Sequence, residues 1–448
     1  MRLSLGFFIF LLVSGCFSSP QQGNISKIDK EIALGNFSRA TVLIDSIIST
    51  GQMDKTQERE LLFVKDSLHR VALDFNKTRA NIVDWIEKNQ LFTPSDSLLE
   101  SWEFSGILEL RRIDGEKRYF RNAAPNVFRV DASARKRGRT SPPTTDVPRD
   151  SLLIRAFNKK TNSGIKGKYL LPEQTIKARY TLTVKPNAVP EGETIKAWLP
   201  FPRKDISRQT NVELLGTSQP DYLLSDDKTA HTSLYMEQKA VKGKPTIFWM
   251  DFEFTSQGEW FDLDAIETTP YDKNSNLYQT YTAEQGPHIR FSKKLRELTD
   301  SVTRNASTPV ETLQAVYRYI AATYPWASAL EYSTIANIPE YVIENRKGDC
   351  GQVTLLLMAM LRYKGIPARW QSGWMTHPQE VNLHDWAEVY FEGTGWIPVD
   401  ISFGRGAPVP ILPGREFFMS GIDSYRLYVN SDFSGELPPQ RNNRFSTG

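Results

Sequence analysis

This 448-residue chain has few cysteines and almost no excess of charge of either sign. It contains two cysteines, and its 55 Lys and Arg residues exceed its 52 Asp and Glu residues by only three. So small an excess excludes the large single-sign field that nucleic-acid-binding proteins carry. The sequence also has no cluster of His, Cys and carboxylates with metal-ligand spacing and no glycine-rich phosphate loop. It therefore implies no metal, no other cofactor and no nucleic acid partner.

Residues 1–15 are typical of a bacterial export signal. Arg2 precedes an apolar run over residues 6–13, and the small residues Ser14 and Gly15 precede Cys16. The run is too short to span a bilayer as an anchor. The segment Leu12-Val-Ser-Gly-Cys16 resembles the bacterial lipobox, which implies that Cys16 is lipidated and becomes the mature N-terminus. The alternative is an ordinary cleavable signal with an incidental cysteine.

Lipidation of Cys16 would place the protein in the cell envelope, with residues 16–24 as a short polar tether. Phe17 follows the cysteine and no acidic cluster follows that. By analogy with lipoprotein sorting, we expect an outer-membrane location. The second cysteine, Cys350, would then be an unpaired thiol in an oxidising compartment, which is a liability unless the thiol has a task. An inert buried cysteine is the alternative.

Patterning divides the rest of the chain into four regions and predicts a multidomain α+β protein. Residues 25–104 show helical periodicity. Residues 105–150 hold a hairpin signal at Asp114-Gly115, then a Ser/Pro/Thr-rich stretch with the basic run 135–139, which we interpret as a solvated linker. Residues 151–286 alternate as strands and predict an antiparallel β-sandwich. Residues 287–448 mix helices with later strands.

The segment that begins at Cys350 predicts a buried helix with the thiol at its N-terminus. Apolar residues recur with helical spacing over 353–361, and Gly365 marks the end. Free backbone N–H groups and the positive end of the helix dipole at that position favour a thiolate. The same N–H groups could bind a developing oxyanion.

A hairpin downstream carries the candidate proton carrier. Residues 384–391 alternate as a strand, 392–395 predict a turn, and 396–400 a return strand. This hairpin places Asp400 within a few paired strand positions of His384. Glu388 shares the strand face of His384 and is an alternative orienting group. His377, in a loop-like context before Pro378, is interpreted as a surface residue. Asp385 should point to the opposite strand face and be solvated.

Four ordered motifs carry a resemblance to the transglutaminase-like superfamily. They are Gly348-Asp-Cys350, Gly365-Ile-Pro-Ala-Arg369, His384-x-Trp-x-Glu-Val-Tyr390 and Gly395-Trp-x-Pro-Val-Asp400. The resemblance implies a papain/transglutaminase-like α+β core. It also implies Cys350 as nucleophile, His384 as general base and acid, and Asp400 as orienter. Trp326 is the candidate for a tryptophan that helps to hold the oxyanion, with packing as its other role. Arg369 and Trp374 are expected to hold the sheet together.

These features favour a thiol-dependent acyl-transfer enzyme that acts on amide bonds of a protein or peptide substrate. The resemblance implies a cysteine peptidase or deamidase more readily than a cross-linking enzyme, because cross-linking requires that water be excluded while an amine attacks. The alternative is a non-catalytic, surface-anchored binding or scaffold lipoprotein. With either function, the helical N-terminal domain is a candidate for binding a protein partner. A glycan-handling role has only the ten tryptophans in its favour.

Overall fold

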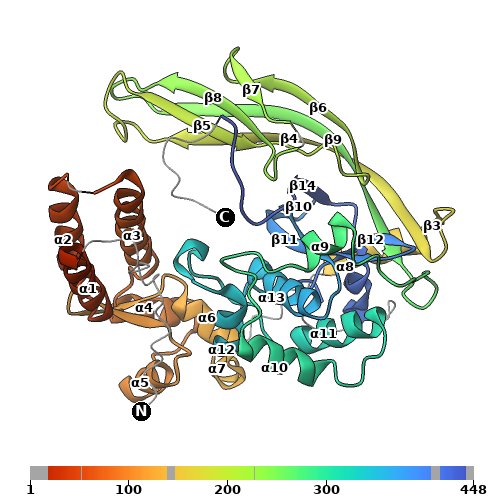
Figure 1. The fold of residues 1–448 in the computed structure, drawn as a ribbon, viewed down its shortest axis with the longest axis horizontal. Helices are drawn as coiled ribbons and strands as arrows, with labels where there is room; N and C mark the ends of the chain where they lie inside the picture. Colours follow the sequence, from red (N-terminus) through yellow and green to blue (C-terminus); the bar gives the residue numbers. More distant parts are fainter. Residues whose placement is uncertain (1–18, 52, 139–146, 227, 405–413, 440–448) are drawn as a thin grey trace. The chain divides into compact units, whose positions relative to one another are not determined.

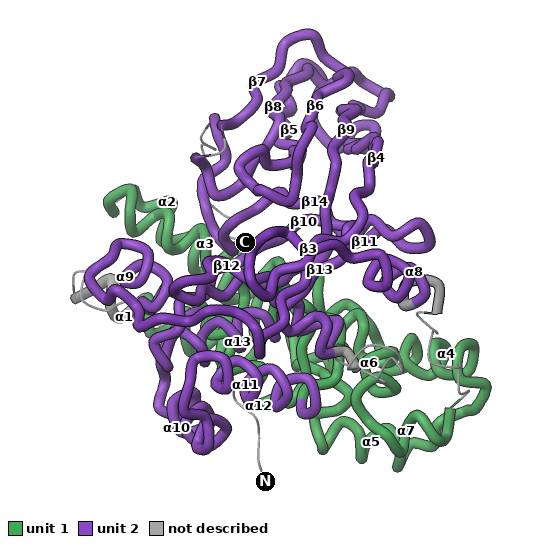
Figure 2. The backbone as a smooth tube through the Cα atoms, turned by 90° about the vertical axis from the view of Figure 1, so that its right-hand side faces the viewer, with its two compact units in different colours: residues 1–144, 286–288, 324–352 green, residues 145–285, 289–323, 353–448 purple. Residues whose placement is uncertain are grey.

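A computed structural model describes residues 19–51, 53–138, 147–226, 228–404 and 414–439. The chain forms two compact units (Figure 2). Unit 1 contains residues 1–144, 286–288 and 324–352, and unit 2 contains residues 145–285, 289–323 and 353–448. The segment 324–352 thus clusters with the N-terminal helices, although the sequence placed it inside one domain spanning 287–448.

The described residues mix helices with antiparallel sheets (Figure 1). The helices are α1 Ser19–Ala33, α2 Phe37–Ser49, α3 Lys55–Asp74, α4 Arg79–Gln90, α5 Asp96–Ser105, α6 Ala123–Val130, α7 Ala132–Arg137, α8 Val147–Asn158, α9 Asn276–Thr282, α10 Lys293–Val302, α11 Pro309–Thr323, α12 Ile338–Asn345 and α13 Cys350–Tyr363, with short 3-10 turns at Tyr332–Thr334 and Gly414–Met419. The strands are β1 Leu110–Ile113, β2 Glu116–Tyr119, β3 Thr161–Asn162, β4 Lys168–Val184, β5 Thr194–Pro200, β6 Gln209–Thr217, β7 Tyr222–Leu224, β8 Ser233–Lys239, β9 Thr246–Phe261, β10 Ala368–His377, β11 Glu380–Phe391, β12 Gly395–Val399, β13 Gly421–Ile422 and β14 Arg426–Asn430.

In unit 1, local sequence signals set the boundaries of the helices and of the hairpin. Asp54 caps α3 by accepting from the N–H groups of Thr56 and Gln57, and Gln57 completes a capping box. β1 and β2 pair through the two-residue turn Asp114-Gly115, where both residues have positive φ, at 48° and 83°. This confirms the predicted hairpin, because a turn with two positive φ values favours Asp-Gly.

Two regions expected to be irregular are helical in the structure. Residues 19–24, interpreted as a tether, belong to α1. Within 131–150, interpreted as a linker, α7 covers the start of the basic run and α8 begins at Val147. Asp131 caps α7 by accepting from the N–H of Ala134. Three basic residues in the last turn of α7 complement the negative end of its dipole, an arrangement that composition alone did not indicate.

In unit 2, two long strands organise the β-rich part. β4 and β9 pair antiparallel over most of their lengths, β6 also pairs with β9, and β5, β8 and β7 form a separate sheet. Alternate residues of β9, from Phe248 to Phe254, pack with residues of β5, β8 and β14 in one apolar cluster. Several antiparallel sheets are therefore present. That they form a β-sandwich stays a prediction.

A four-stranded sheet in the order β12-β11-β10-β14 carries the candidate site. The turn after Phe391 allows β12 to return along β11, with Ala387 opposite Val399, without a bulge. The helix that precedes this sheet in the chain, α13, is mostly apolar and is buried from Gly351 through Arg362.

No helix within the described ranges is long and apolar enough to cross a membrane. The proposed signal and the lipidation candidate Cys16 lie outside the described residues.

Candidate functional site

Cys350 is the first residue of α13, as the sequence predicted. Asp349 precedes it as the helix cap: its Oδ1 accepts from the N–H of Gln352 at 2.9 Å, and the Gln352 side chain accepts from the Asp349 N–H at 3.3 Å. This reciprocal capping fixes the backbone on both sides of the thiol. The thiol is partly exposed and forms no disulfide. It therefore lies at the positive end of a capped helix dipole.

Trp326, the candidate oxyanion residue, lies in the same unit as Cys350. An isolated parallel bridge joins Trp326 to Gly348, two residues before the cysteine. The indole is 41 % exposed, and the Arg129 guanidinium lies 4.6 Å from its ring centroid. A cation over the ring holds the indole plane and adds positive potential beside it. Trp326 is thus a half-exposed side chain at the start of the Cys350 segment rather than part of a core.

The β11–β12 hairpin brings His384 and Asp400 together. Asp400 follows β12 directly, and its Oδ2 lies 2.7 Å from Nε2 of His384. Both side chains are buried. Because Nε2–H donates to this carboxylate, Nδ1 is the nitrogen that can accept a proton. The Phe403 ring stacks on the imidazole at 4.6 Å and 17°, which fixes the ring plane.

Arg426 makes the Asp400 carboxylate a stable anion. Its Nη1 donates to Asp400 Oδ2 at 2.9 Å, and the backbone N–H of Phe403 donates to Oδ1 at 3.2 Å. Burial by itself would raise the pKa of Asp400, but His384 and Arg426 outweigh it and hold that pKa below its usual range. The Asp400 carboxylate is therefore ionised at neutral pH.

The same environment keeps His384 neutral. Burial lowers the pKa of His384 below its ordinary value, and Arg426 lowers it further, against the opposite pull of Asp400. An imidazole that is neutral near pH 7 can act as a general base. The site thus combines a permanent cation, a permanent anion and an uncharged proton acceptor.

The sequence interpretation missed Arg426 and placed His377 wrongly. Arg426 also donates to Asp423 Oδ2 through Nη2 at 2.7 Å, and Asp423 Oδ1 lies 3.3 Å from Nε2 of His377. His377 is the last residue of β10 and only 3 % exposed, so it is not a surface residue. The following proline restricts it to extended backbone, which suits a strand end as well as a loop.

A glycine lets the strand that carries Arg426 approach this close. Gly373 of β10 pairs with His384 on one side and with Tyr428 of β14 on the other. A Cβ atom at Gly373 would lie 1.9 Å from the carbonyl oxygen of Leu427. Any side chain there would push β14 away, and Arg426 with it.

Glu388 has a different set of partners and does not contact His384. Arg208 donates to its Oε1, and Arg369 and Gln371 donate to its Oε2 at 2.6 and 2.9 Å. Arg208 also binds the buried Glu259. Glu388 therefore belongs to a structural ion network, and Arg369 holds β10 and β11 together as expected. Trp374 packs edge-on against Tyr180 of β4.

Asp385 is on the opposite strand face from His384 and is partly exposed rather than fully solvated. Throughout the part of the chain that the structure describes, no three His, Cys, Asp or Glu side chains gather as a potential metal site.

The structure therefore brings His384 together with Asp400, and places Trp326 beside the segment that leads to Cys350. Cys350 and Trp326 belong to unit 1, and His384 and Asp400 belong to unit 2. Chemically, the unit 2 group can accept and return a proton, and the start of α13 can offer a nucleophile and N–H donors.

Comparison with known proteins gives one family match. The sequence model of the Transglutaminase-like superfamily matches residues 296–401. The chain is also 22 % identical over 177 residues to the uncharacterized protein YebA of Bacillus subtilis (strain 168). That alignment covers 35 % of this chain and 24 % of the relative, so the match spans about a quarter of the relative's length.

Solved structures show weaker likeness. A “Putative Cysteine Protease” from Cytophaga hutchinsonii is 17 % identical, with a TM-score of 0.41, and the match covers 52 % of this chain and 78 % of that one. The periplasmic domain of TgpA from Pseudomonas aeruginosa is 16 % identical, with a TM-score of 0.27, covering 52 % and 74 %. Red sea bream transglutaminase is 11 % identical, with a TM-score of 0.23, covering 52 % and 50 %.

Structural similarities with TM-scores this low are too weak to support a function. The likeness to the family therefore rests on the sequence match and its motif residues. Cys350, His384 and Asp400 all lie within residues 296–401, the segment that matches the Transglutaminase-like superfamily model.

Proposed function

We propose that the protein is a thiol-dependent enzyme that cleaves amide bonds of a protein or peptide substrate. Cys350 is the nucleophile, His384 the general base and acid, and Asp400 the orienter. The observation that carries the proposal is the buried His384–Asp400 pair, whose 2.7 Å contact leaves Nδ1 as the proton acceptor. The capped start of α13 at Cys350 supports it.

In the proposed reaction, neutral His384 takes the thiol proton on Nδ1 while the sulfur attacks the amide carbonyl carbon. N–H groups at the start of α13, with Trp326 beside them, hold the resulting oxyanion. Collapse of the tetrahedral intermediate breaks the C–N bond, and the leaving amine takes the proton from His384. Water then attacks the thioester, giving its proton to His384, and the thiolate leaves and is reprotonated.

Hydrolysis is favoured over cross-linking. Transfer to an amine requires a site that excludes water for the lifetime of the thioester. The thiol is partly exposed, which suits resolution of the thioester by water. The proposed activity is accordingly that of a cysteine peptidase or deamidase.

Alkylation of Cys350 tests the proposal without a known substrate. In a Cys16→Ser background Cys350 is the only thiol. We expect iodoacetamide at about pH 7 to label wild type at least ~10-fold faster than His384→Ala, because the imidazole takes the thiol proton. Without the imidazole, the labelling rate should increase only as the pH approaches ~8.5, the pKa of an ordinary cysteine.

His231→Ala is the matched control, since His231 is a half-buried histidine of unit 2 that lies outside the β11–β12 hairpin and forms an isolated bridge with Asn430. It should label like wild type. Equal rates in wild type and His384→Ala would refute the pairing of Cys350 with His384 and leave a non-catalytic scaffold as the better account.

Turnover should survive mild acid. A general base must be neutral, and burial holds the pKa of His384 below its ordinary value. As the pH falls, kcat/KM is therefore expected to be retained through ~6.5 and to be lost only below it. The measurement is a pH profile of peptide hydrolysis, with substrates selected from a peptide library by mass spectrometry. A fall of kcat/KM that begins at or above pH ~6.5 would show that His384 is protonated in the free enzyme and would contradict the prediction.

We also propose that the protein is exported and held in the bacterial envelope by a lipid on Cys16, with the outer membrane as its location. The support is the Leu12–Cys16 sequence alone. Metabolic labelling with an alkyne-tagged palmitate should mark wild type and leave Cys16→Ser unmarked. Equal labelling of the two proteins would rule the anchor out.

A further inference from the structure

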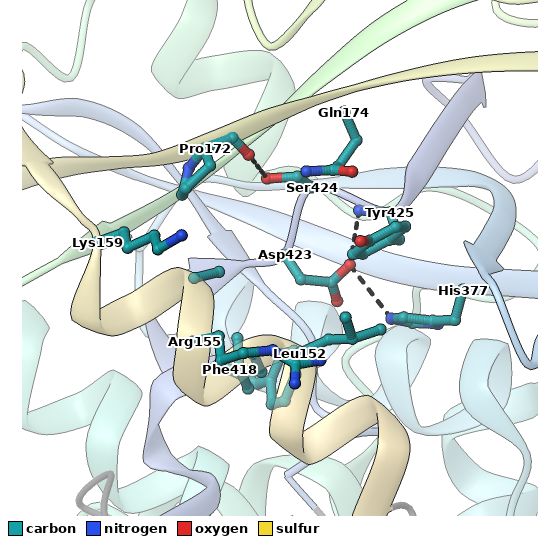
Figure 3. A pocket seen from close by; sticks show the side chains of 12 residues that line it. Leu152, Arg155, Lys159, Pro172, Gln174, His377, Phe418, Asp423, Ser424 and Tyr425 are labelled. Atoms are coloured by element: carbon teal, nitrogen blue, oxygen red, sulfur yellow. Dashed lines mark hydrogen bonds and ion pairs between the residues drawn. The ribbon is translucent and has the colours of Figure 1, made fainter.

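A pocket of about 180 Å³ lies within unit 2, between α8 and the ends of β4, β10 and the segment 423–425. Its walls are apolar where Leu152, Leu153 and Ala156 of α8 face Pro172 and Phe418. Figure 3 shows the polar side, where Asp423 lies between Tyr425 and His377. The volume slightly exceeds the ~150 Å³ of a protein cavity that accepts benzene. The pocket can therefore hold a ligand the size of one aromatic ring with a polar group.

The charge at the rim of the pocket is positive. Arg155 lies in the last turn of α8, and Lys159 follows four residues later. Both are exposed, and neither forms an ion pair with any described residue. Among the described residues that line the pocket, Asp423 is the only carboxylate, and Arg426 binds it. Two cations that have no ion pair among the described residues, over a neutralised carboxylate, favour an anionic ligand.

The floor of the pocket is polar and buried. His377 is 3 % exposed, and its Nε2 makes no hydrogen bond within the described part of the chain, although it lies at ion-pair distance from Asp423. A buried ring nitrogen without a hydrogen bond is costly unless something satisfies it. A ligand oxygen in the pocket could do so.

The floor is also joined to the candidate active site. His377 contacts Asp423 at 3.3 Å, Asp423 accepts from Arg426 at 2.7 Å, Arg426 donates to Asp400 at 2.9 Å, and Asp400 accepts from His384 at 2.7 Å. Every member of this chain is buried, so solvent screens these contacts little. Arg426 binds Asp423 through Nε and Nη2 and Asp400 through Nη1, so a displacement of Asp423 would move the guanidinium that also binds Asp400.

We propose that this pocket is a second ligand site, for a small carboxylate with an apolar body, and that its occupancy is transmitted to His384 through Asp423 and Arg426. The carboxylate binds Arg155 and Lys159 and directs one oxygen toward Nε2 of His377, and the apolar body packs against α8 and Phe418. The site is separate from the residues that would carry catalysis. It does not depend on Cys350 being reactive.

Histidine NMR tests the site on the full chain. With only five histidines, ring-labelled protein gives a readable spectrum, which single His→Gln variants assign. Sodium benzoate should shift the His377 signals saturably, with a Kd in the millimolar range or tighter, and leave His69 and His231 in place. Benzamide lacks the charge and acetate lacks the ring, so each should bind at least ~10-fold more weakly, the factor that corresponds to one lost interaction of ~1.4 kcal/mol.

Charge-removal variants then locate the ligand. Arg155→Gln/Lys159→Gln should weaken benzoate binding at least ~10-fold. Lys242→Gln/Lys244→Gln removes two exposed charges between β8 and β9 and should leave the affinity for benzoate unchanged. No saturable shift of His377, equal binding of benzamide, or full affinity in the Arg155/Lys159 variant would each overturn the site.

The response of His384 tests the transmission. Its signals should move along the same saturation curve as those of His377, and Arg426→Lys, which keeps the charge but not the bidentate contact, should reduce the His384 shift. A shift of His377 with a stationary His384 would overturn the transmission.

Discussion

Replacing Arg426 with methionine is expected to lower the free energy of unfolding by about 3–5 kcal/mol. Arg426 is fully buried and binds two buried carboxylates, those of Asp400 and Asp423. Methionine fills part of the same volume but leaves both carboxylates without their cation. Removing one partner of a buried ion pair costs more than the pair itself contributes, because the remaining charge is not solvated.

The size of this effect should depend on pH in a defined direction. Arg426 holds the pKa of Asp423 well below its usual range and also holds down that of Asp400. Groups with a depressed native pKa stabilise the fold above their unfolded pKa, and that contribution is lost as the pH falls through the native value. The variant lacks most of this contribution, so its deficit should be largest at neutral pH and should shrink in acid.

Urea unfolding of wild type and Arg426→Met at about pH 7 and about pH 3, which is below the ~3.9 pKa of an unfolded aspartate, measures both effects. Arg179→Met is the matched control, because Arg179 pairs with Asp251 on an exposed sheet face and should change stability little. Adding Asp423→Asn to Arg426→Met should recover part of the loss, since it removes one of the two stranded charges. A stability loss no greater than that of Arg179→Met would mean that the cluster is solvated in solution.

The local features of the site could be predicted from sequence. The helix after Cys350 follows from apolar spacing, and the His384–Asp400 contact follows from a hairpin whose turn is marked by two glycines. In each case the information lies within about 20 residues, where periodicity and turn chemistry constrain the backbone. Glu388 was the competing orienter on the same strand face, and its arginine partners come from elsewhere in the chain.

The charged residues behind the imidazole could not be predicted. Arg426 lies 26 residues beyond Asp400, in a short strand with no distinguishing pattern, and His377 precedes a proline that suggested a loop. Arginine and histidine are usually exposed, so composition argued for the surface at both positions. Only the pairing of β14 with β10, at a glycine, places these groups in the interior.

Changing Asp400 to asparagine is expected to reduce kcat about 10³- to 10⁴-fold, the loss that follows when the orienting carboxylate of a triad becomes an amide. Asp400 uses both oxygens as acceptors: Oδ2 faces His384 and Arg426, and Oδ1 faces the N–H of Phe403. An amide supplies one acceptor and one donor. In either orientation its NH₂ group meets a donor, so the imidazole loses either its tautomer or its position.

Glu388→Gln separates this effect from general damage to the sheet. Glu388 is as deeply buried as Asp400 and binds two arginines, so its amide should destabilise the fold. It does not contact His384, and kcat of the folded fraction should stay within a few-fold of wild type. Peptide hydrolysis and urea unfolding measured on both variants give the comparison. If Asp400→Asn lost stability but kept its kcat, Asp400 would be a structural anion, and His384 would have to be oriented by the Phe403 stack alone.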